Sequence, residues 1–132
     1  MIVVDTSALM AIALNEPRAE ACAAVLEVES EAAISAATLA EALIVAARRD
    51  CAEDVAAIIY LLGFEVVPVT EARARRIAAA YAQWGKGVHP AGLNFGDCFA
   101  YELAHERACP LLFVGADFVR TDVRSALTAP AR

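Results

Sequence analysis

Residues 93–104 read LNFGDCFAYELA, and the rest of the chain can be interpreted around this stretch. Asn94 is a typical N-cap residue, so the pattern predicts a helix that begins after it and carries Asp97 in its first turn. Gly96 would let other groups approach the backbone closely. The helix dipole and the free amide groups of a first turn favour an ionised carboxylate. Asp97 could therefore hold a cation or simply cap the helix, and other converging carboxylates would favour the first role.

Short apolar runs alternate with helical patterns on both sides of this stretch. The expected strands cover residues 1–4, 32–35, 64–69 and 111–114. The expected helices cover residues 7–14, a segment after Pro17, and residues 38–49, 52–62, 71–84 and 95–107. Residues 38–41 (TLAE) match the capping-box pattern, which starts a helix at Thr38 and puts Glu41 in its first turn. The alternation predicts an α/β fold with a mainly parallel sheet covered on both faces.

Length and composition indicate one domain over residues 1–132, rich in alanine and in helix. No apolar run approaches the roughly 20 residues needed to span a bilayer, and the N-terminus lacks the pattern of a signal peptide. A cytoplasmic protein is expected. The four cysteines show no paired metal-ligand spacing, so we interpret them as reduced core residues.

The net charge of −6 is unevenly distributed. Residues 1–66 carry 11 acids and 3 bases (−8), and residues 67–132 carry 6 acids and 8 bases (+2). An acidic protein is a poor general binder of nucleic acids unless some acids are metal ligands. In the basic half, Arg73, Arg76 and Lys86 are candidate phosphate contacts, although an arginine cluster on a helix is more often a solvated face.

Four acids from separate segments are expected at one edge of the sheet. Asp5 follows the first strand and Asp117 follows the last one, while Glu41 and Asp97 open helices. In parallel α/β folds, ligands gather outside the carboxyl ends of the strands, where these side chains would meet. Each acid has a simpler interpretation as a cap or turn residue.

Converging carboxylates favour a metal site. Grouped acids in a partly buried site cannot all stay ionised without a cation, and hard oxygen ligands favour Mg²⁺ or Mn²⁺ over Zn²⁺. Such ions support hydrolysis of phosphodiesters. The chain has neither a P-loop nor a GxSxG motif, and neither histidine has an obvious nucleophile beside it.

Four segments also resemble, in order, the motifs of PIN-domain ribonucleases, above all VapC-type toxins of bacterial type II toxin–antitoxin modules. They read IVVDTSA (residues 2–8), TLAE (38–41), LNFGDCFAY (93–101) and LLFVGADF (111–118). The resemblance covers essentially the whole chain. It implies a three-layer α/β/α PIN fold, a metal-dependent endoribonuclease, a cognate VapB-type antitoxin and a homodimer.

The resemblance also implies roles for particular residues. Asp5 and Asp97 would be the principal Mg²⁺ ligands, with Mn²⁺ as a substitute. Glu41 would complete the shell or orient a metal-bound water, Asp117 would be the fourth acid, and the Ser7 hydroxyl would bond to a carboxylate or to metal-bound water.

One departure from the family pattern leaves alternatives open. Many PIN domains have an acid or asparagine just before the fourth acid, whereas Gly115 and Ala116 precede Asp117 here. Asp122 is a possible substitute for Asp117, and a PIN-like protein-binding module with little catalysis is the competing function. A phosphatase with Asp5 as nucleophile is disfavoured, because Ser7 stands where a DxD motif needs its second aspartate.

Overall fold

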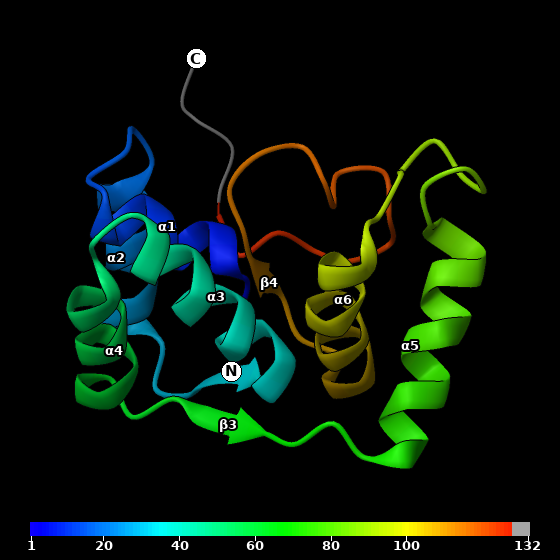
Figure 1. Ribbon diagram of the computed structural model, residues 1–132, viewed down its shortest axis with the longest axis horizontal. Helices are drawn as coiled ribbons and strands as arrows, with labels where there is room; N and C mark the ends of the chain where they lie inside the picture. The colour runs from blue at the N-terminus through cyan, green and yellow to red at the C-terminus, as the bar shows by residue number, and fades with distance from the viewer. Residues whose placement is uncertain (128–132) are drawn as a thin grey trace.

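Four short parallel strands form the centre of the molecule in the computed structural model, which describes residues 1–127 (Figure 1). Their bounds are β1 Ile2–Val4, β2 Ala32–Ser35, β3 Glu65–Val67 and β4 Leu111–Leu112. The strand order is β3-β2-β1-β4, and every adjacent pair is parallel. In the register, Val3 lies opposite both Ala33 and Leu111. The predicted parallel sheet is confirmed.

Helices cover both faces of this sheet. They are α1 (Thr6–Ala13), α2 (Ala19–Val28), α3 (Ala36–Arg48), α4 (Ala52–Leu61), α5 (Glu71–Trp84) and α6 (Phe95–Arg107). Successive side chains of a strand point to opposite faces of the sheet, so alternate residues pack into two different cores. Ile2 and Val4 pack in one core with α1 to α4, whereas Val3 packs in the other with α5 and α6. The three-layer α/β/α arrangement is therefore confirmed (Figure 1).

The start of α6 follows the prediction closely. The Asn94 side chain accepts a hydrogen bond from the Asp97 backbone N–H at 2.9 Å, and Asp97 Oδ2 accepts one from the Asn94 N–H at 3.0 Å. This reciprocal capping box satisfies two amide groups that a helix start leaves free. Asp97 is thus the third residue of α6, and the backbone N–H of Asn94 fixes its carboxylate.

The predicted start of α3 was wrong. The helix begins at Ala36 and is capped by Ser35, whose Oγ accepts from the Ala37 N–H at 3.3 Å. Ser35 ends β2 and is itself a good N-cap, so the chain turns directly into the helix. Thr38 is therefore buried inside α3, and Glu41 lies in the second helical turn instead of the first.

Three strands are shorter than predicted, β1 by one residue only. The fourth keeps only Leu111 and Leu112, because the Val114 N–H leaves the ladder and donates to Ser7 Oγ at 3.0 Å. The third is limited to Glu65–Val67. In the last described segment, Ser125 forms an isolated parallel bridge with Leu111. Residues 128–132 lie outside the described residues.

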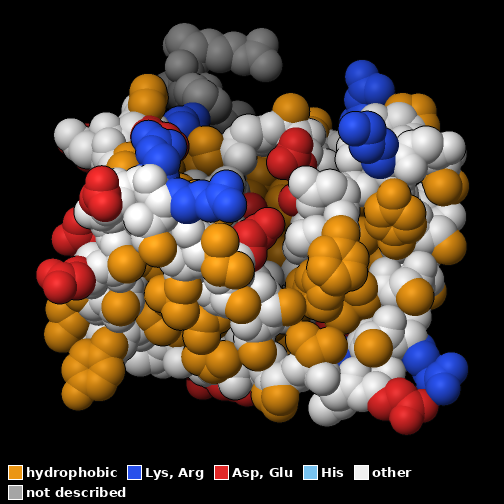
Figure 2. All heavy atoms as spheres, viewed as in Figure 1, with side chains coloured by type: hydrophobic (Ala, Val, Ile, Leu, Met, Phe, Trp, Pro, Cys, Tyr) orange, Lys and Arg blue, Asp and Glu red, His pale blue; other side chains and the backbone are white. Residues whose placement is uncertain are grey.

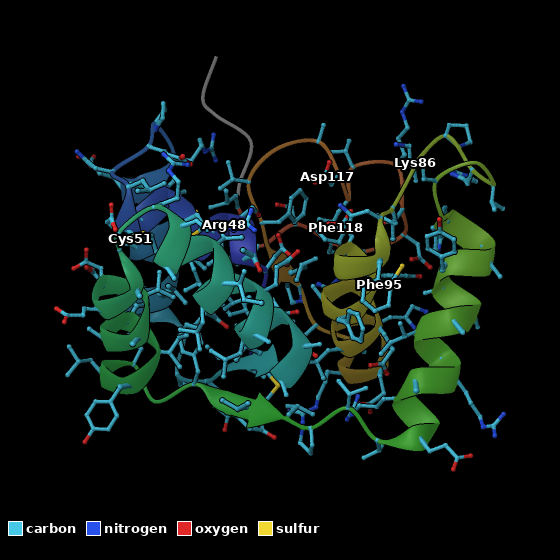
Figure 3. All side chains as sticks on the ribbon, in the orientation of Figure 1. Arg48, Cys51, Lys86, Phe95, Asp117 and Phe118 are labelled. Carbon is cyan, nitrogen blue, oxygen red and sulfur yellow. The ribbon has the colours of Figure 1, made fainter. Side chains whose placement is uncertain are left out.

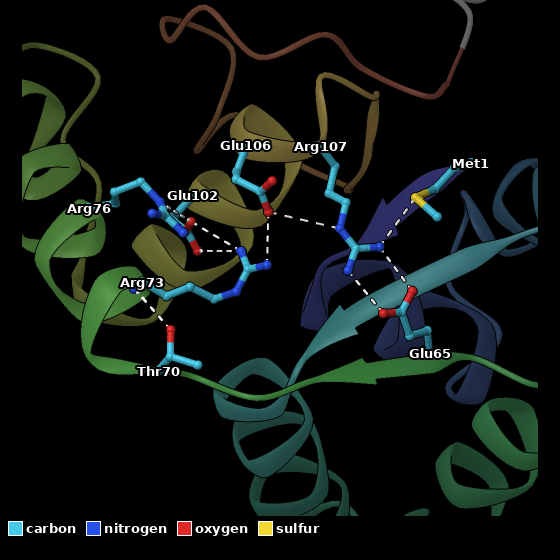
Figure 4. Close-up of polar contacts among 8 residues, drawn as sticks. All are labelled: Met1, Glu65, Thr70, Arg73, Arg76, Glu102, Glu106 and Arg107. Carbon is cyan, nitrogen blue, oxygen red and sulfur yellow. Dashed lines mark hydrogen bonds and ion pairs between the residues drawn. The ribbon is translucent and has the colours of Figure 1, made fainter.

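Ion pairs join α5 to α6 (Figure 4). Glu102, which is buried on α6, accepts from Arg76 Nε at 2.9 Å and from an Arg73 guanidinium nitrogen at 3.3 Å. Arg73 also reaches Glu106 at 2.8 Å. The interpretation of Arg73 and Arg76 as phosphate contacts is therefore not supported, because both guanidinium groups already have carboxylate partners.

All four cysteines are free, and Cys22, Cys51 and Cys98 are buried in the cores, as predicted. Cys109 is only partly buried and packs against the second core. Within residues 1–127, none of the helices combines the length and the apolar character required to cross a membrane.

Candidate metal and catalytic site

Asp5 leaves β1 directly into the N-cap position of α1. Its Oδ2 accepts hydrogen bonds from the Ser7 N–H at 3.1 Å and from Ser7 Oγ at 2.7 Å. Because Ser7 Oγ also accepts from the Val114 N–H, this hydroxyl connects the ends of β1 and β4. Burial raises the pKa of Asp5 above its usual range, the nearby charge of Glu41 adds to the rise, and the Ser7 hydrogen bonds oppose it.

Glu41 reaches the same place from α3. Its Oε1 accepts a hydrogen bond from Thr6 Oγ1 at 2.7 Å. The other oxygen, Oε2, lies against Gly96 so closely that a Cβ at that position would come within 2.5 Å of it. The absence of a side chain at Gly96 therefore gives the Glu41 carboxylate its space beside the first turn of α6.

Asp97 is the electrostatic centre of the group. Its residue is 8% exposed, and burial raises the pKa of the carboxyl to about 6. The charges of Asp117, Asp5 and Glu41 add to the rise, and the hydrogen bond from Asn94 opposes it. All three predicted partners thus lie within electrostatic range of Asp97, so the fold brings the four acids to one edge of the sheet.

Asp117 and Asp122 have different surroundings. Asp117 is exposed in the turn after β4, next to Phe118, which is buried and anchors that turn (Figure 3). Asp122 accepts a hydrogen bond from the Tyr101 hydroxyl at 2.6 Å, and this hydroxyl accepts one from Trp84 Nε1 at 3.0 Å. Asp122 therefore secures the loop to α6, and Asp117 is the acid whose charge acts on Asp97.

Sequence reasoning missed the group formed by Trp84, Tyr101 and Asp122. One signal was available, because Tyr101 stands four residues after Asp97 and so shares its side of the helix. Nothing in the pattern indicated that Asp122 would be the partner of Tyr101. This group holds the Asp117-bearing loop against the helix that carries Asp97.

The donor set suits a hard divalent cation. Within residues 1–127, no three histidine, cysteine or acidic side chains form a preformed metal cage. Mg²⁺ rarely uses such a cage, because it usually keeps several waters and binds one or two carboxylates. In the same part of the chain, none of the four acids forms an ion pair with lysine or arginine. Mutually repelling carboxylates without a cationic partner, of which Asp5 and Asp97 are buried, fit a cation site.

Comparison with known proteins identifies the family. A family profile described as the PIN domain matches residues 2–124. The chain belongs to the PIN-domain family. This PIN domain is 44% identical over 130 residues to Ribonuclease VapC28 of Mycobacterium tuberculosis, covering 96% of this chain and 98% of the relative. It is 40% identical over 125 residues to Ribonuclease VapC30 of the same species, covering 92% and 95%.

Solved structures agree on the fold. Mycobacterium tuberculosis VapC20, described as a sarcin-ricin loop cleaving toxin, superposes with a TM-score of 0.80 at 17% identity. The match covers 97% of this PIN domain and 100% of that chain. A toxin–antitoxin complex from Klebsiella pneumoniae gives a TM-score of 0.70 at 20% identity, covering 98% and 100%.

Proposed function

We propose that this PIN domain is a metal-dependent endoribonuclease, the toxin of a type II toxin–antitoxin module. The observation that carries the proposal is the surroundings of Asp97: a buried carboxylate among three other acids, with no ion pair in residues 1–127. The relatives named as ribonucleases support the reaction class. An enzyme of this kind would act on RNA in the cytoplasm, with residues 1–132 as a single catalytic domain.

In this proposal Asp5 and Asp97 hold Mg²⁺, and Mn²⁺ can replace it. When bound, such a cation would activate a water and stabilise the leaving oxygen of a phosphodiester. Ser7 fixes the Asp5 carboxylate, so this ligand is positioned before any cation binds. Glu41, held by Thr6, has its second oxygen free of hydrogen bonds to the described residues and can accept one from the attacking water. Asp117, which is exposed in the turn after β4, is the fourth acid of the site.

A VapB-type antitoxin is the proposed protein partner. The VapC names of the relatives support this partner. The edge of the sheet that carries Asp5, Glu41, Asp97 and Asp117, called the acid edge below, also supports it. An arginine of the antitoxin could pair bidentately with the carboxylates and so block the site.

A second copy of the chain is also proposed as a partner. Figure 2 shows hydrophobic side chains gathered over α3, α4 and α6. Ile44 on α3 is 61% exposed and Phe95 on α6 is 74% exposed, and a groove of about 490 Å³ between α5 and α6 adjoins Phe95. A broad apolar surface of this kind marks a protein interface.

Light scattering would test the dimer. Ile44→Glu should convert the dimer to a monomer. Val28→Glu introduces the same charge at an 80% exposed site on α2 and should leave the mass unchanged. A monomeric wild type at micromolar concentration would contradict the dimer.

Cleavage kinetics test the enzyme. Protein freed of antitoxin and supplied with Mg²⁺ or Mn²⁺ should cut RNA, and Asp97→Asn should slow cleavage by roughly 100-fold or more. Asp54→Asn is the matched control, because Asp54 is an exposed first-turn acid of α4. If the wild type cut no RNA with either ion, or if both variants cut equally well, the competing function as a protein-binding PIN-like module would be favoured.

A further inference from the structure

The cationic side chains of the described residues divide into two groups, those with a carboxylate partner and those without one. Arg73, Arg75, Arg76 and Arg107 form ion pairs with glutamates at α5, α6 and β3. Six others form no ion pair with any of residues 1–127: Arg18, Arg48, Arg49, Lys86, Arg120 and Arg124. Arg48 and Lys86 are exposed members of this second group. In Figure 3 the side chains of Arg48 and Lys86 lie on opposite sides of Asp117, and Figure 2 shows basic side chains on both sides of a hollow that exposes acidic ones.

Arg48 belongs to the same helix face as Glu41. The two residues are seven positions apart on α3, which is nearly two full turns. The side chain of Arg48 therefore projects from the same side of the helix, about 10 Å further along its axis. A cation here stands beside the acid site without neutralising it.

Lys86 is held on the opposite side by the backbone. Its N–H donates to the Leu93 carbonyl at 2.9 Å, and the Leu93 N–H donates to the Trp84 carbonyl at 3.0 Å. Leu93 is buried and directly precedes the Asn94 cap of α6. These hydrogen bonds fix the backbone of Lys86 relative to the start of α6, which carries Asp97.

We propose that Arg48 and Lys86 bind phosphates of a single RNA strand on either side of the acid edge, so that the strand crosses the four carboxylates. The inference rests on the proposed ribonuclease function. An RNA backbone approaching grouped carboxylates is repelled, and cations on both sides of the group lower that barrier. Arg73 and Arg76 cannot serve in this way while they pair with Glu102.

Neutralising substitutions test this assignment in the full-length protein. Arg48→Gln and Lys86→Gln should each weaken binding of a fluorescent single-stranded RNA and raise KM several-fold, with kcat within twofold of the wild type. The slope of log K against log salt concentration should become shallower by about 0.7 for each lost phosphate contact. Arg75→Gln is the matched control, because Arg75 is exposed and its ion pair is with Glu71 of its own helix.

The possible outcomes distinguish failure of this inference from failure of the ribonuclease proposal on which it rests. If the wild type cuts RNA but Arg48→Gln and Lys86→Gln behave like Arg75→Gln, the inference fails and the ribonuclease proposal stands. If the two variants lose affinity for the antitoxin while RNA affinity is unchanged, the cations belong to a protein interface and the inference is overturned. If the wild type cuts no RNA, both proposals fail together.

Discussion

Helix α6 carries two buried carboxylates whose surroundings are opposite. Glu102 is 5% exposed and pairs with Arg73 and Arg76. Asp97, five residues earlier, is 8% exposed and faces the charges of three other carboxylates. The same helix therefore holds one acid whose charge is balanced by the protein and another whose charge is not.

The difference separates a structural role from a functional one. A buried charge is tolerated when it is paired and hydrogen-bonded, and then it connects elements, as Glu102 connects α5 to α6. A buried carboxylate that meets only like charges and a capping amide is held at a cost in stability. Such a group is a functional-site candidate, because a ligand can supply the missing cation. Each variant below should affect one region and leave the other unchanged.

The largest expected change in stability comes from Glu102→Gln. It leaves two guanidinium groups without their shared carboxylate and should lower the free energy of unfolding by about 2–3 kcal/mol. This is less than for a fully buried pair, because the Arg76 side chain is 48% exposed. Urea unfolding measures the loss. The affinity for Mn²⁺ should be unchanged.

Glu106→Gln is the control for this prediction, since the Glu106 side chain is 37% exposed and contacts Arg73 from the next turn of α6. Glu106→Gln should lower the free energy of unfolding by less than about 1 kcal/mol. A loss of Mn²⁺ affinity in Glu102→Gln would contradict the separation of the two regions.

Gly96→Ala should weaken metal binding with little effect on stability. The added Cβ would come within 2.5 Å of Glu41 Oε2 and turn that carboxylate away from the site. Alanine also suits a helical position better than glycine, so the change in unfolding free energy should stay within about 1 kcal/mol. We expect Mn²⁺ affinity to fall about tenfold, which corresponds to about 1.4 kcal/mol.

A double-mutant cycle with Glu41→Gln sharpens this prediction. If Gly96→Ala acts through Glu41, it should have little further effect once Glu41 has been replaced. Full additivity of the two losses would show that the Cβ acts on some other group.

The stability of the metal-free protein should also depend on pH. The pKa of Asp97 is about 6 in the folded protein, against an ordinary value of 3.8. Between these values the folded state keeps a proton that the unfolded state releases, so metal-free protein should lose stability as pH rises from about 4 to 6. A shift of this size corresponds to about 3 kcal/mol, which solvent screening of a partly buried carboxyl should reduce to about 1–2 kcal/mol. Asp97→Asn should remove this contribution. Unfolding in EDTA at several pH values measures this, and identical profiles for the two proteins would contradict it.

Much of this arrangement was predictable from local patterns. The Asn94 N-cap and the placement of Asp5 after β1 depend on neighbouring residues, and both were predicted. The predicted start of α3 was wrong because Ser35 and Thr38 are both good N-cap residues. Since β2 ends at Ser35, the helix begins directly after that residue. The pairing of Arg73 and Arg76 with Glu102, and of Tyr101 with Asp122, depends on how α5 and the last loop pack on α6. Spacing along the chain carries no information about such contacts.

Titration calorimetry of metal-free protein with Mn²⁺ at neutral pH tests the central claim most directly. The account predicts that the wild type binds the cation, that Asp5→Asn and Asp97→Asn each weaken binding at least tenfold, and that Glu102→Gln and Asp54→Asn bind like the wild type. A wild type that binds neither Mn²⁺ nor Mg²⁺, or an Asp97→Asn variant that binds as tightly as the wild type, would contradict it.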